Sequence, residues 1–129
     1  MIINGKQVSR EVLEGLKNKI EALRQAQGSP LRLAAVLVSN NPGIKKFVEL
    51  KGKAAGEIGV DYEIYEFPET TTEQRLKKEV RKIVQDEAND GVLVELPLPK
   101  GINVQTILNE VPLKKDVDVL SQEAQERFY

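Results

Sequence analysis

One lysine and one glutamate stand where the surrounding sequence is apolar, and both side chains can move protons. On the helical repeat of residues 44–58, Lys51 falls near the middle of the apolar arc. A lysine there must extend to solvent, pair with a carboxylate or lose its charge. Glu95 interrupts the apolar run Val92 to Leu96, and carboxylates seldom lie in buried strands unpaired. We therefore expect a Lys51–Glu95 pair, which is either a structural ion pair or a candidate acid/base site.

The composition excludes several other kinds of catalysis. The 129 residues contain no Cys and no His. Thiol catalysis, disulfides, imidazole acid/base chemistry and the usual zinc sites are therefore excluded. Asp116 and Asp118 lie two residues apart, but one such pair without further oxygen ligands is a weak metal signal. The sequence predicts no metal site, and any catalysis must depend on Lys, carboxylates, Tyr or hydroxyls.

The charge balance argues against polyanionic partners. Nineteen basic residues face twenty acidic ones, for a net charge of −1. No overall field would attract nucleic acid or an anionic membrane surface, so we expect neither partner. There is no charged-then-apolar leader at the N-terminus and no apolar run near the roughly 20 residues that span a bilayer. We expect a cytoplasmic protein.

Helical and strand patterns alternate along the chain. Continuously apolar strands indicate a parallel sheet that is buried on both faces, and the helices would cover it. We expect an α/β fold, a three-layer α/β/α domain with a mostly parallel sheet, formed by residues 1–129 as one domain. The expected helices are residues 9–26, 44–58, 72–86, 103–111 and one starting near Ser121, and the expected strands are residues 33–38, 62–67 and 91–96.

Local signals set the expected ends of these elements. Ser9 and Asn103 are expected N-caps, and Thr71 with Gln74 resembles a capping box. Gly28 and Gly59 are expected to end the first two helices.

The loops that follow the strands should form a cleft. In open parallel sheets, ligands bind at the carboxyl ends of the strands, which places the loops after Val38, Phe67 and Leu96 together. We expect the Lys51–Glu95 pair at the floor of this cleft. The G-x-G-x-x-G pattern after the first strand and the P-loop pattern are both absent. The chain should therefore bind no dinucleotide cofactor by itself.

Several motifs, in order along almost the whole chain, carry a family resemblance. They are Ile3-Asn4-Gly5-Lys6, the turn Leu37 to Pro42, Phe47-Val48-Glu49-Leu50-Lys51, Leu93 to Pro99, and Lys115-Asp116-Val117-Asp118. Together they resemble the N-terminal catalytic domain of the bifunctional methylenetetrahydrofolate dehydrogenase/cyclohydrolase family, often called FolD. The resemblance implies an enzyme that interconverts 5,10-methylene-, 5,10-methenyl- and 10-formyltetrahydrofolate. It also implies a further NAD(P)-binding domain and a homodimer in the full-length enzyme.

The resemblance also implies roles for individual residues. Lys51 would be the general acid/base, with Glu95 beside it, and Asp118 would hold the pterin edge of tetrahydrofolate. Phe47 would stack on the aminobenzoyl ring. Pro97, Leu98 and Pro99 would shape the wall of the pocket.

Four positions depart from the family pattern. The family's Tyr is Phe47 here, its small Ser is Ile44, its Gln is Glu95, and its Gly after the second Asp is Val119. A degenerate folate-binding module without turnover is therefore the alternative function. A receiver-like signalling domain is a more distant one. It needs an acidic pair just after the first strand and an Asp at the end of the third, and Ser39-Asn40 and Glu95 do not supply these.

Overall fold

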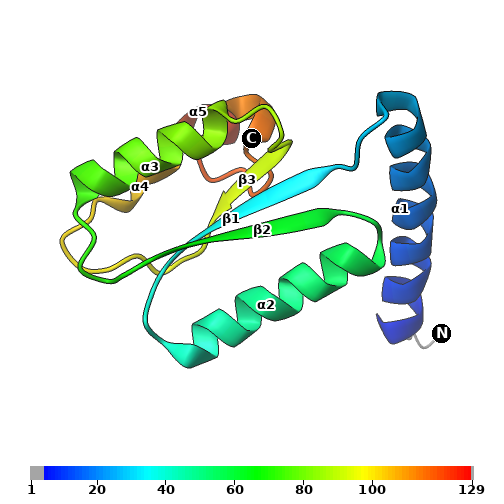
Figure 1. The fold of residues 1–129 in the computed structure, drawn as a ribbon, viewed down its shortest axis with the longest axis horizontal. Coiled ribbons are helices and arrows are strands. Elements are labelled where there is room, and N and C mark those ends of the chain that lie inside the picture. The colour runs from blue at the N-terminus through cyan, green and yellow to red at the C-terminus, as the bar shows by residue number, and fades with distance from the viewer. Residues whose placement is uncertain (1–4, 129) are drawn as a thin grey trace.

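The computed structural model describes residues 5–128 of the chain. Three parallel strands alternate with helices, as the sequence predicts (Figure 1). In chain order the elements are α1 Gly5–Gln27, β1 Arg32–Val38, α2 Pro42–Glu57, β2 Asp61–Phe67, α3 Glu73–Gln85, β3 Gly91–Val94, α4 Val104–Leu108, the 3-10 turn η1 Leu113–Lys115 and α5 Gln122–Phe128.

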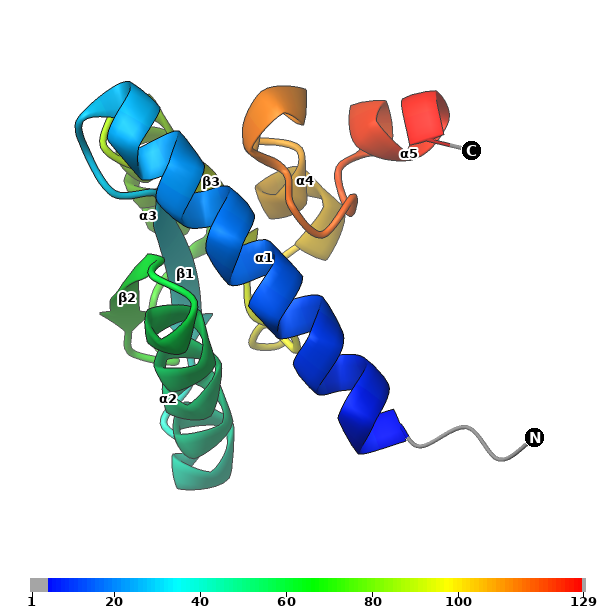
Figure 2. The same ribbon diagram turned by 90° about the vertical axis from the view of Figure 1, so that its right-hand side faces the viewer.

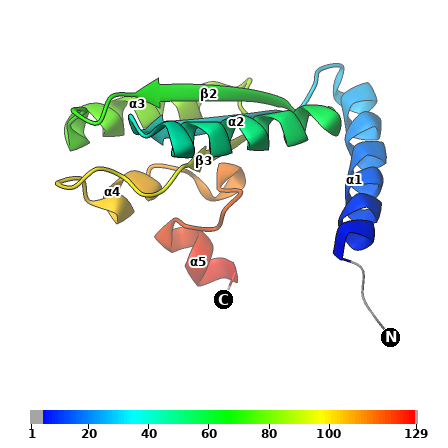
Figure 3. The ribbon, with the colours of Figure 1, turned by 90° about the horizontal axis from the view of Figure 1, so that it is seen from below.

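The strands form one sheet with the order β2-β1-β3, and both pairings are parallel. The central strand β1 is buried from Ala34 to Val38. Two apolar clusters lie on its two faces. One joins the sheet to α3 and α4 through residues such as Leu76 and Ile107, and the other joins it to α2 through Val48. Figure 1 shows α3 and α4 above the sheet and α2 below it, and Figure 3, from below, shows α2 in front of the strands. This arrangement confirms the three-layer α/β/α prediction.

The first helix differs from its prediction in two ways. It is already helical at Gly5, so Ser9 lies inside α1 and is not its N-cap. Serine is only mildly unfavourable in a helix interior, and the helix-forming residues before it extend the helix. No residue of α1 is buried: its apolar stripe at Val12, Leu16 and Leu23 is exposed. Figures 1 and 2 show α1 lying across one end of the sheet.

Several element ends match the sequence signals. Gly28 and Gly59 follow α1 and α2 with φ of 76° and 86°, the left-handed conformation that glycine adopts without strain. The Asn103 side chain caps α4 by accepting from the Thr106 amide at 3.1 Å.

Other ends need correction. Thr72, not Thr71, caps α3 by accepting from the Arg75 amide, while the Thr71 hydroxyl donates to the Pro68 carbonyl. The helix α4 ends at Leu108 and not at residue 111, because the chain tightens into a turn.

Strand β3 ends at Val94, two residues earlier than predicted. The Glu95 amide still donates to the Val36 carbonyl at 2.8 Å. The Leu96–Pro97 peptide is cis, and Pro97 has no N–H with which to continue the ladder. The chain therefore leaves the sheet directly after Glu95. Among the described residues, no helix has both the length and the apolar character needed to cross a membrane.

Candidate active site

The structure brings Lys51 and Glu95 together from separate elements. The Lys51 ammonium, on α2, lies 3.1 Å from both carboxylate oxygens of Glu95, which follows β3. The Glu95 side chain is 8% exposed, whereas that of Lys51 is 41% exposed. Within residues 5–128, Lys51 is the one ion-pair and side-chain hydrogen-bond partner of this carboxylate. A nearly buried carboxylate thus depends on one lysine that solvent can reach.

The apolar arc of α2 proves wider than its buried face. Val48 and Ala55 are buried against the sheet, so Lys51 stands at the edge of that face and not at its centre. Phe47 is 58% exposed. The Lys51 ammonium lies 5.0 Å from the centre of the Phe47 ring, within the range of a cation–π contact. The ring therefore offers an open aromatic surface beside the ion pair.

A cleft lies where the sequence predicts one, at the carboxyl ends of the strands. It is lined by residues from all three loops, including Ser39, Glu69 and Pro97, with Ile44 at the start of α2. Leu98 and Pro99 also line it.

Four of the predicted site residues stand outside this cleft. Its lining does not include Phe47, Lys51, Glu95 or Asp118. Along the chain, the pair flanks residues of this lining: Lys51 follows Ile44 on α2, and Glu95 stands two residues before Pro97.

The charged segment 115–118 divides into structural and free side chains. Lys115 donates to two carbonyls at the end of α3, those of Val84 and Asp86. The Asp116 carboxylate accepts from the amides of residues 120 and 121, which fixes the turn before α5. Asp118 is exposed and makes no hydrogen bond or ion pair within the described residues. Only the second aspartate is therefore available to a ligand.

Val119 follows Asp118 with a φ of 56°. The left-handed region is unfavourable for a β-branched residue, whereas glycine adopts it freely. This conformation gives a physical reason for the glycine that the family resemblance implies at this position. Valine therefore keeps the turn at a cost in backbone strain.

Sequence reasoning missed Tyr62, which lies under the same helix. Its ring packs against the cluster between α2 and the sheet that contains Val48 and Leu93, and its hydroxyl is buried. Burial first, then the charges of Glu95 and Asp118, raise the pKa of Tyr62 to about 12. A signal was present in the sequence: Gly52 is unusual inside a helix and marks a close approach. A Cβ there would lie 2.8 Å from the Tyr62 ring.

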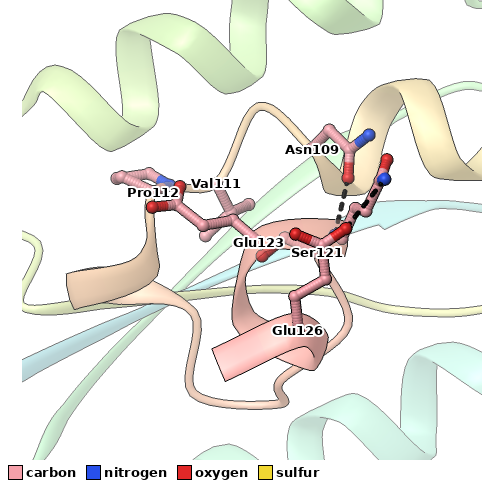
Figure 4. Close-up of a pocket in the computed structure, with 7 residues that line it drawn as sticks. Asn109, Val111, Pro112, Ser121, Glu123 and Glu126 are labelled. Carbon is pink, nitrogen blue, oxygen red and sulfur yellow. Dashed lines mark hydrogen bonds between the residues drawn. The ribbon is translucent and has the colours of Figure 1, made fainter. Parts of the chain in front are cut away.

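A second cavity opens between the end of α4 and α5 (Figure 4). Asn109, Ser121 and Glu126 are among its lining residues, and none of the predicted site residues is. The side chain of Asn109 accepts from the Gln122 amide across the cavity, and Ser121 caps α5 through the Ala124 amide. Its polar groups thus hold α5 in place.

The loop after β1 does not fit a dinucleotide pyrophosphate. The Asn41 side chain accepts from the Gly43 and Ile44 amides, so these helix N-terminal donors are already satisfied. The N-terminal amides of α2 are thus paired within the chain itself.

Comparisons with known proteins agree on one family. The profile of the tetrahydrofolate dehydrogenase/cyclohydrolase catalytic domain matches residues 3–118. The bifunctional protein FolD of Staphylococcus aureus is 38% identical over 117 residues, which are 91% of this chain and 41% of that protein.

Solved structures give the same result. The FolD enzyme of Campylobacter jejuni superposes with a TM-score of 0.89 at 33% identity, over 95% of this chain and 43% of that one. FolD of Trypanosoma brucei, solved with NADP cofactor and an inhibitor, gives 0.83 at 27% identity over 92% and 40%. This chain thus spans less than half the length of these relatives.

Proposed function

Because the chain belongs to the tetrahydrofolate dehydrogenase/cyclohydrolase catalytic domain family, we propose that it binds tetrahydrofolate derivatives on the α2 face. The observation that carries this proposal is the Lys51–Glu95 contact beside the open ring of Phe47. Folates combine a flat pterin, an aromatic aminobenzoyl ring and a reactive one-carbon bridge. The carboxylate of Asp118 suits the pterin, the ring of Phe47 suits the aminobenzoyl group, and the Lys51–Glu95 pair suits the one-carbon bridge.

Each side chain has a part in binding. The ring of Phe47 stacks on the aminobenzoyl group. The unpaired carboxylate of Asp118 accepts from adjacent N–H donors on the pterin. Pro97, Leu98 and Pro99 line the neighbouring cleft and form its wall.

The reaction proposed for this site is hydrolysis of the methenyl bridge. Water adds to the methenyl carbon, and Glu95 accepts a proton from that water. The Lys51 ammonium donates a proton to the ring nitrogen as its bond to the bridge carbon breaks, and the hydroxyl proton of the water adduct leaves to solvent as the formyl C=O forms. The products are 10-formyltetrahydrofolate and one released proton. The 3.1 Å contact of the two groups lets the proton pass back from Glu95 to Lys51.

The dehydrogenase step requires a hydride acceptor. The Trypanosoma brucei relative was solved with NADP, a cofactor that can accept a hydride. Residues 5–128 present no glycine-rich turn or open helix end for that group, so we derive no step through it. We expect the chain alone to reduce no NADP with methylenetetrahydrofolate. Measurable reduction would contradict this expectation.

Titration calorimetry with 5-formyltetrahydrofolate, together with a cyclohydrolase assay on methenyltetrahydrofolate, tests the proposal. Binding with turnover supports it. Binding without turnover would make the chain a folate-binding module, which is the alternative raised by Phe47 and Glu95. Absence of binding would overturn the proposed function.

A further inference from the structure

The Tyr62 hydroxyl is a buried donor without an acceptor. It makes no hydrogen bond within the described residues. By contrast, the hydroxyl of Tyr65 on the same strand accepts from Arg32 at 3.0 Å and from Asn89 at 3.3 Å. A buried, unsatisfied hydroxyl costs free energy, so its presence needs an explanation.

The packing places Tyr62 under the turn of α2 that carries Lys51. Its ring lies against Gly52, the residue after Lys51, where a Cβ would come within 2.8 Å. It packs against the apolar cluster that contains Leu93, and Leu93 stands two residues before Glu95. The glycine that interrupts α2 thus makes room for the Tyr62 ring underneath Lys51.

The Glu95 carboxylate is an acceptor that can lose its one donor. It is nearly buried and has one ion-pair partner among the described residues, the partly exposed Lys51. A ligand that engages the Lys51 ammonium would leave this carboxylate without a donor, which is strongly unfavourable for a buried charge. Tyrosine can supply the missing donor through a charge-assisted O–H···O⁻ bond.

We propose that Tyr62 is a positioning residue whose hydroxyl donates to the Glu95 carboxylate when a bound folate engages Lys51. This inference rests on the proposed function. It gives the buried hydroxyl a role and supplies, from β2, the hydroxyl that Phe47 lacks. The raised pKa of Tyr62, about 12, keeps the phenol protonated and therefore a donor at neutral pH.

The test uses tyrosine labelled with ¹³C at Cζ, whose chemical shift reports hydrogen bonding by the phenol. Tyr62→Phe assigns the signal by its disappearance, and Tyr65→Phe is the matched control on the same strand. We expect 5-formyltetrahydrofolate to move the Tyr62 signal. We also expect Lys51→Met to move it in the same direction without any folate, because that change likewise removes the lysine partner of Glu95.

Affinity and stability give the second readout. Tyr62→Phe should leave the unfolding midpoint of the free protein unchanged or higher, because the lost hydroxyl has no partner there. It should weaken folate binding by about tenfold or more, the usual loss for a hydrogen bond to a charged group. Tyr65→Phe should lower the unfolding midpoint and leave the affinity unchanged.

Two results separate the inference from the proposed function. A Tyr62 signal that stays in place in Lys51→Met would overturn the inference while the chain still binds folate. Equal folate affinity of Tyr62→Phe and the unaltered chain would also overturn it alone. Absence of folate binding by the unaltered chain would overturn the proposed function and, with it, this role for Tyr62.

Discussion

The carboxylates of Glu110 and Glu95 differ in the number of their partners. Glu110 pairs with two basic residues of α3, whereas Glu95 pairs with one lysine of α2. Glu110 accepts from Arg81 at 2.8 and 3.2 Å and lies 3.6 Å from Lys77, although its side chain is 16% exposed. Glu95 is more buried and has one lysine. A carboxylate with redundant partners fixes two elements together. A carboxylate whose one partner is a solvent-exposed lysine can lose that partner when a ligand binds the lysine.

The largest loss of activity should come from removing Lys51, the partner of Glu95. Lys51→Met replaces it with a long apolar side chain that fits the edge of the buried face, so the chain should still fold. Loss of the proton donor should lower the cyclohydrolase rate by about a hundredfold or more. Stopped-flow absorbance of methenyltetrahydrofolate measures this rate, and circular dichroism checks the fold. Unchanged turnover would reduce Lys51 to a solvent-directed structural lysine.

Asp116 and Asp118 allow the same comparison between a structural carboxylate and a ligand-binding one within a single segment. Asp118→Asn should weaken folate binding by about 1.5–3 kcal/mol, the range for a hydrogen bond to a charged group, without a comparable loss of stability. The matched variant Asp116→Asn should lower stability instead, because Asp116 accepts from the turn before α5. Calorimetry and urea unfolding of both variants measure these effects. Equal folate affinity of Asp118→Asn would reject its assignment to the pterin.

Glu110 should behave as a structural carboxylate with a defined pH dependence. The hydrogen bond from Arg81 lowers the pKa of Glu110. Its stabilisation is therefore complete above the pKa of an unfolded glutamate, about 4.3, and is lost as the pH falls through the lower folded value. Glu110→Gln should cost about 1 kcal/mol at pH 7, because exposure of the partners screens the pair.

This difference from the unaltered chain should shrink as the pH falls below about 4. Urea unfolding at a series of pH values measures it, and folate affinity at pH 7 should stay unchanged. A loss of stability that does not vary with pH would show that the charge of Glu110 contributes nothing.

The smallest expected effect concerns Val119, whose φ of 56° is unfavourable for valine. Relief of left-handed strain should outweigh the greater chain entropy of glycine, so Val119→Gly should raise the free energy of unfolding by about 0.5 kcal/mol. The shift of the urea midpoint at constant slope measures it. A lower midpoint would show that the packing of the valine side chain outweighs its backbone strain.

The spacing of apolar residues predicted the helices and strands, because the buried face of each element determines that spacing. The apolar runs of β1 and β3 indicated strands covered on both faces, and the sheet is parallel with helices on each side. The same reasoning predicted the helix α1 but not the exposure of its apolar stripe. An amphipathic pattern indicates a face that can be buried, but it does not indicate what covers that face. Pro97 indicated where β3 must stop, but the strand ends two residues before Leu96, because the missing N–H of Pro97 leaves the Glu95 amide as the last donor of the ladder.

The candidate site was predicted only in part, for a physical reason. Lys51 and Glu95 were visible as charges in apolar surroundings, and their pairing follows. Tyr62 was hidden because a tyrosine in a strand is unremarkable, and its importance depends on the contact with Gly52 from another element. Contacts between elements have no local period, so the sequence pattern does not reveal them.

The most direct measurement compares Glu95→Gln with Glu110→Gln in one pH–rate experiment on methenyltetrahydrofolate hydrolysis. If Glu95 is the base beside Lys51, Glu95→Gln should nearly abolish the rate across the profile, while Glu110→Gln should follow the unaltered chain. A profile of Glu95→Gln that overlays that of the unaltered chain would contradict the account. It would show that Glu95, like Glu110, holds the fold together and does not touch the chemistry.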